Sequence, residues 1–150
     1  MSASRTARER ARAELIREIK DAARRQLAEV GAAGLSLRAV ARELGMVSSA
    51  IYRYFPSRDD LLTALIIEAF DDVGDAVRRA DAACPRDDLL GRWLACCRAV
   101  REWALAHPHE YALIHGTPVP GYVAPEDTAR PAAGGAVVLA GVLRDAHAAG

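Results

Sequence analysis

Apolar residues recur at three- and four-residue steps along almost the whole chain, which is the spacing of amphipathic α-helices. The first such run, from Leu15 to Val30, is expected to end at Gly31 and Gly34. A second, short helix is expected from Ser36, a favourable N-cap residue, to Leu44. A third is expected from about Ser48 to Tyr54. Because no segment alternates as a strand would, the pattern predicts an all-α protein.

Local signals place the ends of the later helices. Ser57 and Asp60 have the spacing of a capping box, which opens a helix. His107 precedes a proline, which disfavours helical backbone and ends one, and Pro131 is tolerated in a first turn. The predicted segments are a helix from Ser57 to Val77, a connector at 81–85, a fifth helix from about Leu90 to His107, a short helix at 108–115, a loop at 117–125 and a last helix from about Thr128.

The second and third predicted helices meet the packing constraints of a helix-turn-helix. Two helices that cross closely need a small residue at the crossing, and Ala41 supplies it. The turn needs a residue that tolerates positive φ, which Gly45 does, and Ile51 can fill the joint between the helices. This spacing favours a DNA-reading unit, although two short helices joined at a glycine also occur as plain packing.

The net charge of zero hides an asymmetry along the chain. Residues 1–60 hold 12 basic and 8 acidic side chains, a net charge of +4, and residues 61–150 hold the reverse, a net charge of −4. A basic N-terminal part and an acidic C-terminal part are expected when only the N-terminal part binds a polyanion such as DNA. A chance imbalance is the alternative.

Several other classes of function are disfavoured. The chain lacks the roughly 18 uninterrupted apolar residues of a membrane span, and its Arg-rich N-terminus is not a secretory signal, so we expect a cytoplasmic protein. Without a phosphate loop, nucleophile elbow or HExxH sequence, neither an enzyme nor a bound cofactor is expected. Cys84, Cys96 and Cys97 form no CxxC pair and are expected to be small core residues in a reducing compartment.

Directly after the predicted turn the chain reads Ile51-Tyr52-Arg53-Tyr54-Phe55-Pro56-Ser57-Arg58-Asp59-Asp60-Leu61-Leu62. This run resembles the signature of the TetR family of transcriptional regulators, whose members show Leu-Tyr-x-His/Tyr-Phe-x-x-Lys/Arg-x-x-Leu. The likeness extends upstream through residues 36–45 and covers about 50 contiguous residues. A second, weaker resemblance, over residues 107–125, is to an actinobacterial-type subgroup of the family's ligand-binding domains.

The N-terminal residues of the second helix of such a unit reach base edges in the major groove. Ser48, Ser49 and Ala50 hold that position; serine can bond to almost any base and alanine can touch a thymine methyl, so modest specificity is expected. Family members often have Ser or Thr where this chain has Val47, so Ser48 is the expected cap of this helix, one residue later. The predicted DNA contacts are Ser36, Arg38, Ser48, Ser49, Ala50, Tyr52, Arg53, Tyr54 and Arg58.

The remaining contacts in that set are assigned by chemistry and by resemblance. Arg53 suits guanine, Arg38 a base or a phosphate, and Ser36 caps a helix whose N-terminus favours phosphate. The resemblance implies that the hydroxyls of Tyr52 and Tyr54 and the guanidinium of Arg58 bind phosphates.

Two of these interpretations have alternatives. Tyr52 could pack in the joint between the two helices, with no contact to DNA. Arg5 and Arg8 either reach a minor groove or belong to a solvated tail.

The part of the chain beyond about residue 80 has the composition of a small-molecule pocket, largely apolar with a few polar groups. A plain core is the alternative for each residue. A zinc or copper site from the histidines and cysteines is weaker, because their spacing matches no recognised site. The apolar side of the fifth helix is predicted as Leu90, Trp93, Leu94, Cys97, Val100, Ala104 and Leu105. The candidate ligand-binding residues are Trp93, Cys97, Trp103, His107, Tyr111 and His115.

The resemblance implies a helix-turn-helix DNA-binding domain of three helices at residues 1–58 and a helical ligand-binding and dimerisation domain at residues 59–150. We therefore expect a repressor that binds a palindromic double-stranded DNA operator as a homodimer and is released by a small, largely apolar effector. A DNA-binding regulator without a ligand and a helical protein-interaction module are the alternatives. Family members usually continue with two further helices that form the dimer. This chain is therefore expected either to be cut short after Gly150 or to dimerise through other surfaces, such as its last helix.

Overall fold

The computed structural model describes residues 6–150, which contain helices and connecting segments but no strand. Arg5, one of the two expected minor-groove arginines, lies outside the described residues. The described chain forms two compact units, one that ends at Leu62 and one that begins at Thr63. The division falls slightly later than the predicted boundary after residue 58, because the first residues of the fourth helix belong with the N-terminal unit.

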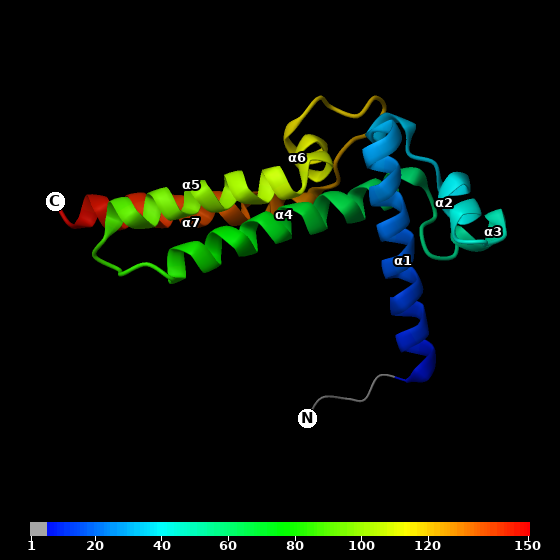
Figure 1. The fold of residues 1–150 in the computed structure, drawn as a ribbon, viewed down its shortest axis with the longest axis horizontal. Helices are drawn as coiled ribbons and strands as arrows, with labels where there is room; N and C mark the ends of the chain where they lie inside the picture. Colours follow the sequence, from blue (N-terminus) through cyan, green and yellow to red (C-terminus); the bar gives the residue numbers. More distant parts are fainter. Residues whose placement is uncertain (1–5) are drawn as a thin grey trace. The chain divides into compact units, whose positions relative to one another are not determined.

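The N-terminal unit is built on a long helix, α1 (Ala7–Val30), which opens with a capping box between Thr6 and Glu9 (Figure 1). Gly31, at φ 70°, ends it as predicted, and a short 3-10 turn (Ala32–Gly34) follows. Helix α2 (Leu37–Glu43) packs against α1 and against α3 (Ser48–Ile51). The buried side of α1 consists of Ile19, Ala22, Ala23, Gln26 and Leu27.

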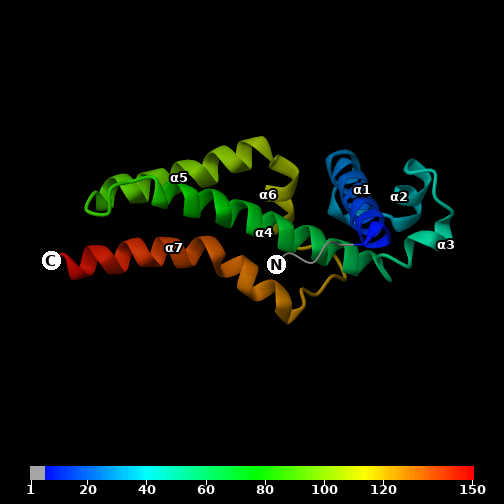
Figure 2. The ribbon, with the colours of Figure 1, turned by 90° about the horizontal axis from the view of Figure 1, so that it is seen from below.

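The C-terminal unit contains most of α4 (Arg58–Ala82) together with α5 (Leu89–Ala106), α6 (Pro108–His115) and α7 (Ala129–Ala148). From Thr63 onward α4 runs alongside α5 and α7 (Figures 1 and 2). A Cβ added at Gly74 would lie 3.6 Å from the backbone nitrogen of Gly135, so α4 and α7 approach closely there. The core cluster of Ala69, Val73 and Trp103 is packed by Val100, Ala104 and Ile114.

Most predicted boundaries in this unit agree with the structure. Helix α5 ends before His107, α6 begins at Pro108, and Pro131 lies in the first turn of α7. The predicted connector at 81–85 begins later, because α4 continues through Asp81 to Ala82. Asp88 then caps α5, its carboxylate accepting a hydrogen bond of 2.9 Å from the Gly91 nitrogen.

The prediction of the buried side of α5 is correct only for Val100 and Ala104, which pack against the core cluster. The buried residues are Arg92, Cys96 and Trp103, whereas the side chains of Leu90 and Leu105 are 69% and 65% exposed. The guanidinium of Arg92 lies on the buried side, where it pairs with the carboxylates of Asp81 and Asp145.

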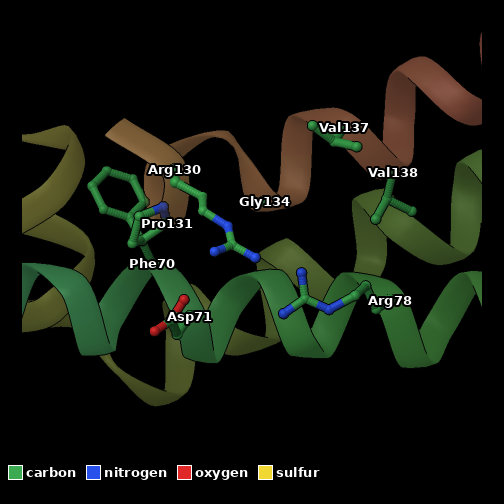
Figure 3. Close-up of a pocket in the computed structure, with 8 residues that line it drawn as sticks. All are labelled: Phe70, Asp71, Arg78, Arg130, Pro131, Gly134, Val137 and Val138. Atoms are coloured by element: carbon green, nitrogen blue, oxygen red, sulfur yellow. The ribbon is translucent and has the colours of Figure 1, made fainter. Parts of the chain in front are cut away.

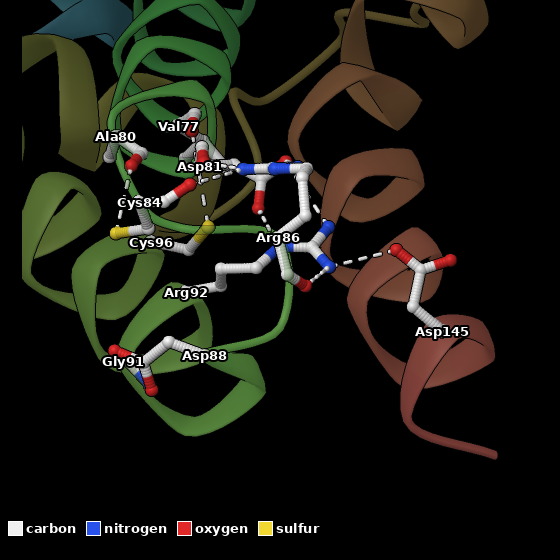
Figure 4. Close-up of polar contacts among 10 residues, drawn as sticks. All are labelled: Val77, Ala80, Asp81, Cys84, Arg86, Asp88, Gly91, Arg92, Cys96 and Asp145. Atoms are coloured by element: carbon white, nitrogen blue, oxygen red, sulfur yellow. Dashed lines mark hydrogen bonds and ion pairs between the residues drawn. The ribbon is translucent and has the colours of Figure 1, made fainter. Parts of the chain in front are cut away.

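Figure 4 shows the contacts of Arg92, which we call the Arg92 network. Its Nε donates to Asp81 Oδ1 of α4 at 2.7 Å, and its Nη1 donates to Asp145 Oδ2 of α7 at 2.8 Å. Arg86 Nη1 also donates to Asp81, at 2.9 Å. The hydrogen bond from Arg92 holds the pKa of Asp81 below its ordinary value. The network therefore joins three helices at the end of the C-terminal unit.

The three cysteines are free thiols in different surroundings. Cys96 is buried against the Val77 carbonyl, and burial raises the pKa of its thiol. Cys84 is half-buried, and Cys97 is exposed, so the expectation of a core position is wrong for Cys97. Within residues 6–150, no three His, Cys, Asp or Glu side chains gather as metal ligands would. None of the described helices is long and apolar enough to cross a membrane.

Candidate functional site

The joint between α2 and α3 satisfies the three predicted constraints of a helix-turn-helix. Ala41 and Ile51 are fully buried where the two helices meet. Gly45 adopts φ 67°, a conformation that costs an L-residue about 1–2 kcal/mol. The Met46 nitrogen donates to the Ala41 carbonyl at 2.8 Å and closes the turn. This joint presents α3 as a rigid element.

Helix α3 begins at Ser48 as predicted, but it is shorter than predicted and has a different cap. It ends at Ile51 rather than Tyr54, because the chain turns so that Phe55 becomes buried before Pro56; the Tyr54 nitrogen donates to the Ile51 carbonyl at 2.9 Å. Val47 holds the N-cap position with extended backbone and no side-chain bond. The expectation that Ser48 caps the helix is therefore wrong, since Ser48 is its first residue.

The structure leaves most of the predicted DNA contacts accessible. The exposed residues are Arg38, Ser48, Ser49, Tyr52 and Arg53, and the half-buried ones are Ser36, Ala50, Tyr54 and Arg58. The Tyr52 side chain is 43% exposed, which does not fit complete packing in the joint. Ser36 caps α2, its Oγ accepting a hydrogen bond of 3.3 Å from the Ala39 nitrogen. Five polar side chains therefore face solvent around one short helix.

Arg58 has partners within the protein that the sequence did not indicate. Its Nη2 donates to the carbonyl oxygens of Ala32 at 3.0 Å and Ala33 at 3.3 Å, and its Nη1 lies 3.7 Å from Asp59 Oδ1. These bonds tie the turn after α1 to the first residue of α4. No local pattern could have revealed them, because the partners are 25 and 26 residues apart in sequence.

Two pockets lie beside α4 in the C-terminal unit. The larger, of about 590 Å³, opens between α4 and α7, with the guanidinium groups of Arg78 and Arg130 extending into it (Figure 3). Arg78 is paired with Asp75, whereas Arg130 forms no ion pair with any described residue. The smaller pocket, of about 170 Å³, is mostly apolar; it is lined by Phe70, Val73, Val77, Val100, His115, Ala132, Gly135, Ala136 and Leu139. Phe70 borders both pockets.

Of the six predicted ligand-binding residues, one lines either of these two pockets. Of these residues, His115 lines the smaller pocket, where its ring contacts Phe70 and Tyr111 at centroid distances of 5.9 and 5.0 Å. Trp103 belongs to the core, stacks on His107 at 5.2 Å, and has a buried Nε1 without a hydrogen-bond partner among the described residues. Trp93 is half-buried, and Cys97 is exposed. Phe70 and the Ala- and Gly-rich face of α7 also form pocket walls, and the sequence pattern did not predict them.

Comparison with known proteins covers both units. Residues 19–65 match the family model described as bacterial regulatory proteins, tetR family, and residues 93–150 match a tetracyclin repressor-like C-terminal domain. The chain is 50% identical over 140 residues to the HTH-type transcriptional regulator Rv1816 of Mycobacterium tuberculosis, covering 93% of this chain and 58% of that protein. It is 32% identical over 106 residues to the uncharacterized HTH-type transcriptional regulator Rv0681 of the same organism, covering 71% of this chain and 47% of that protein.

Solved structures share the fold. The regulatory protein SCO4313 superposes with a TM-score of 0.81 at 45% identity, covering 91% of this chain and 64% of that one. A protein of unknown function from Rhodococcus sp. RHA1 superposes with a TM-score of 0.78 at 30% identity, covering 90% of this chain and 69% of that one. A tetR family transcription regulator from Shewanella sp. PV-4 superposes with a TM-score of 0.71 at 24% identity, covering 90% of this chain and 71% of that one. At this identity the likeness supports a shared fold only. The chain spans about half the length of the curated relatives it matches.

Proposed function

The chain belongs to the TetR family of bacterial transcriptional regulators, and we propose that it is a repressor that binds a palindromic operator as a homodimer. The observation that carries this proposal is the short helix α3, fixed by buried Ala41 and Ile51 and surrounded by exposed Ser48, Ser49 and Arg53. One such unit reads few base pairs, so two copies related by a two-fold axis are needed for useful affinity. DNA binding is assigned to the N-terminal unit and regulation to the C-terminal unit.

The test of this proposal is binding to the DNA upstream of the protein's own gene. The purified protein is expected to bind an inverted repeat there, and to bind a duplex with a single half-site at least about tenfold more weakly. Affinity should fall steeply as salt is added, because phosphate contacts release counterions. Fluorescence anisotropy with a labelled duplex measures both effects. Equal affinity for a scrambled duplex, or no binding near physiological salt, would favour the protein-interaction module instead.

We further propose that a small molecule bound beside α4 lowers the affinity for DNA. Helix α4 carries Arg58 at its first residue and Phe70 and Arg78 farther along, so one helix contains both a predicted DNA contact and pocket walls. An effector weakens operator binding if it prefers the conformation of the dimer that cannot span both half-sites. The loss of DNA affinity is set by the difference between the effector's affinities for the two conformations. The volume of the larger pocket is within the range of small-molecule sites.

Filling the smaller pocket should impair effector binding. An Ala136→Phe variant is expected to bind anilinonaphthalene sulfonate, an apolar fluorescent probe, at least about tenfold more weakly, because the added ring occupies the apolar space. Ala133→Phe is the matched control, since Ala133 is exposed on the same helix and lines neither pocket. Fluorescence titration gives both dissociation constants. If the two variants bind the probe equally, the smaller pocket is not the effector site, and the larger pocket beside α4 is the one to test.

The family and its named relatives give no reason to assign a catalytic reaction, and we propose none. Bacterial transcriptional regulators act on the chromosome, which lies in the cytoplasm, so we propose that this protein is cytoplasmic.

The proposed homodimer could use α7. Its Val137 and Leu143 are 66% and 56% exposed, and such exposed apolar side chains are typical of an interface.

A further inference from the structure

The N-terminal unit contains a pocket lined by three arginines and by no acidic residue. It has a volume of about 390 Å³ and lies between the first turns of α1 and the turn that follows α3. Arg8 and Arg12 are four residues apart and therefore share one face of α1, and Arg53 faces them from the turn. The lining residues, which we call the arginine pocket, are Arg8, Ala11, Arg12, Leu15, Arg53 and Tyr54.

Arg12 is held in position by two contacts from the turn after α3. Its guanidinium carbon lies 5.0 Å from the centroid of the Tyr54 ring, within the range of a cation–π interaction. Its Nη2 donates to the Arg53 carbonyl at 3.5 Å. A guanidinium has five N–H donors, so these contacts leave most of the donors of Arg12 available to a ligand.

The carboxylates nearest in sequence have other partners. Glu9 accepts a hydrogen bond of 2.7 Å from the Thr6 nitrogen in the capping box, and Glu14 is paired with Arg17 one turn farther along α1. Neither Arg8 nor Arg53 forms an ion pair with another described residue. Three gathered cations without an internal anion repel one another, and a bound anion would relieve that repulsion.

We propose that the arginine pocket binds one phosphate of the operator backbone, so that α1 is part of the DNA interface. Arginine suits this ligand because its planar fork makes bidentate hydrogen bonds to phosphate oxygens. The pocket wall at Arg53 and Tyr54 follows directly after α3, which would bring a backbone phosphate near it when α3 lies in the groove. This inference rests on the proposed function, and it assigns Arg53 to the backbone rather than to the guanine predicted from the sequence.

The first experiment compares Arg12→Ala and Arg8→Ala with Arg10→Ala in the full chain. Arg10 is exposed on the same helix and does not line the pocket, so its loss changes the net charge equally. Arg12→Ala and Arg8→Ala should weaken binding to operator and scrambled duplexes alike, by about five- to tenfold, and reduce the slope of log affinity against log salt by about one per half-site. Arg10→Ala should stay within about twofold of the wild type. Arg12→Lys keeps the charge and should retain most of the salt dependence of binding. If it does, the loss in Arg12→Ala is due to the missing charge rather than to misfolding.

The second experiment replaces single operator phosphates with neutral methylphosphonates. At one phosphate position, the methylphosphonate should weaken the binding of the wild-type protein. The same replacement should not weaken the binding of Arg12→Ala any further, because both changes remove the same contact. If the wild type does not prefer its operator, the proposed function fails. If it does, but Arg12→Ala keeps the wild-type affinity and salt slope, the arginine pocket does not bind phosphate. If Arg12→Ala weakens binding to the operator but not to the scrambled duplex, Arg12 contacts a base rather than a phosphate, and the inference is overturned.

Discussion

An Asp81→Asn variant is expected to melt about 5 to 10 °C below the wild type at neutral pH. Arg92, only 3% exposed, would keep its charge while losing its ion pair with α4. Its remaining partners are Asp145, whose side chain is 45% exposed, and the Arg86 carbonyl at 3.3 Å. Asparagine preserves the shape of the side chain, so the change isolates the charge. Thermal melting followed by circular dichroism measures the difference.

The same variant should alter the pH dependence of stability. Because the folded protein lowers the pKa of Asp81, this carboxylate stabilises the fold fully above its unfolded pKa of about 3.9 and loses that effect as the pH falls through the folded value. The gap between the melting temperatures of wild type and variant should therefore narrow below about pH 4. Asp75→Asn is the control, since its pair with Arg78 is exposed and should matter little. Equal melting of the two variants would show that the Arg92 network is not structurally important.

Arg58→Ala is expected to weaken operator binding by roughly 100-fold, about tenfold for each half-site of a dimer. The variant would lose the predicted phosphate contact and the hydrogen bonds that fix the turn after α1 to α4. Arg58→Lys separates these two contributions, because lysine keeps the charge but lacks the guanidinium Nη2 that donates to both carbonyl oxygens. Anisotropy titrations over a range of salt concentrations give the affinity and the number of phosphate contacts.

Arg79→Ala serves as the control for Arg58, since Arg79 is exposed on the same helix and lines neither pocket. It should bind the operator within about twofold of the wild type. If Arg58→Ala also binds like the wild type, the phosphate assignment and the role of α4 in linking effector to DNA are both wrong. If Arg58→Lys is as weak as Arg58→Ala, the hydrogen bonds to Ala32 and Ala33 matter more than the charge.

The positions of the helices could be predicted because their signals are local. Gly31, Gly45 and Pro108 act through their own backbone, and Ser36 caps the helix that follows it. The start of α3 at Ser48 was correct, but its cap was not, because the backbone of Val47 takes the cap position without a side-chain bond. Local chemistry therefore located the helix-turn-helix but misassigned the cap and the end of α3.

The arrangement of the C-terminal unit could not be predicted in the same way. The buried Arg92 of α5 has partners that lie 11 and 53 residues away in sequence. Trp103 belongs to the core and His115 lines the smaller pocket because of neighbours on α4, which no local pattern indicates. For the same reason the wall contributed by α7 was not recognised, since small residues such as Gly135 show their role only when a neighbouring helix approaches.

The chain contains two tryptophans, and both lie on α5 in the C-terminal unit. Trp103 is buried in the core of that unit and Trp93 is half-buried. Intrinsic tryptophan emission is therefore an optical reporter of the C-terminal unit alone, because the N-terminal unit has no indole to excite. Compound binding can be followed in the unlabelled protein by this emission while a dye on the DNA reports the operator, so both titrations can be read from one cuvette.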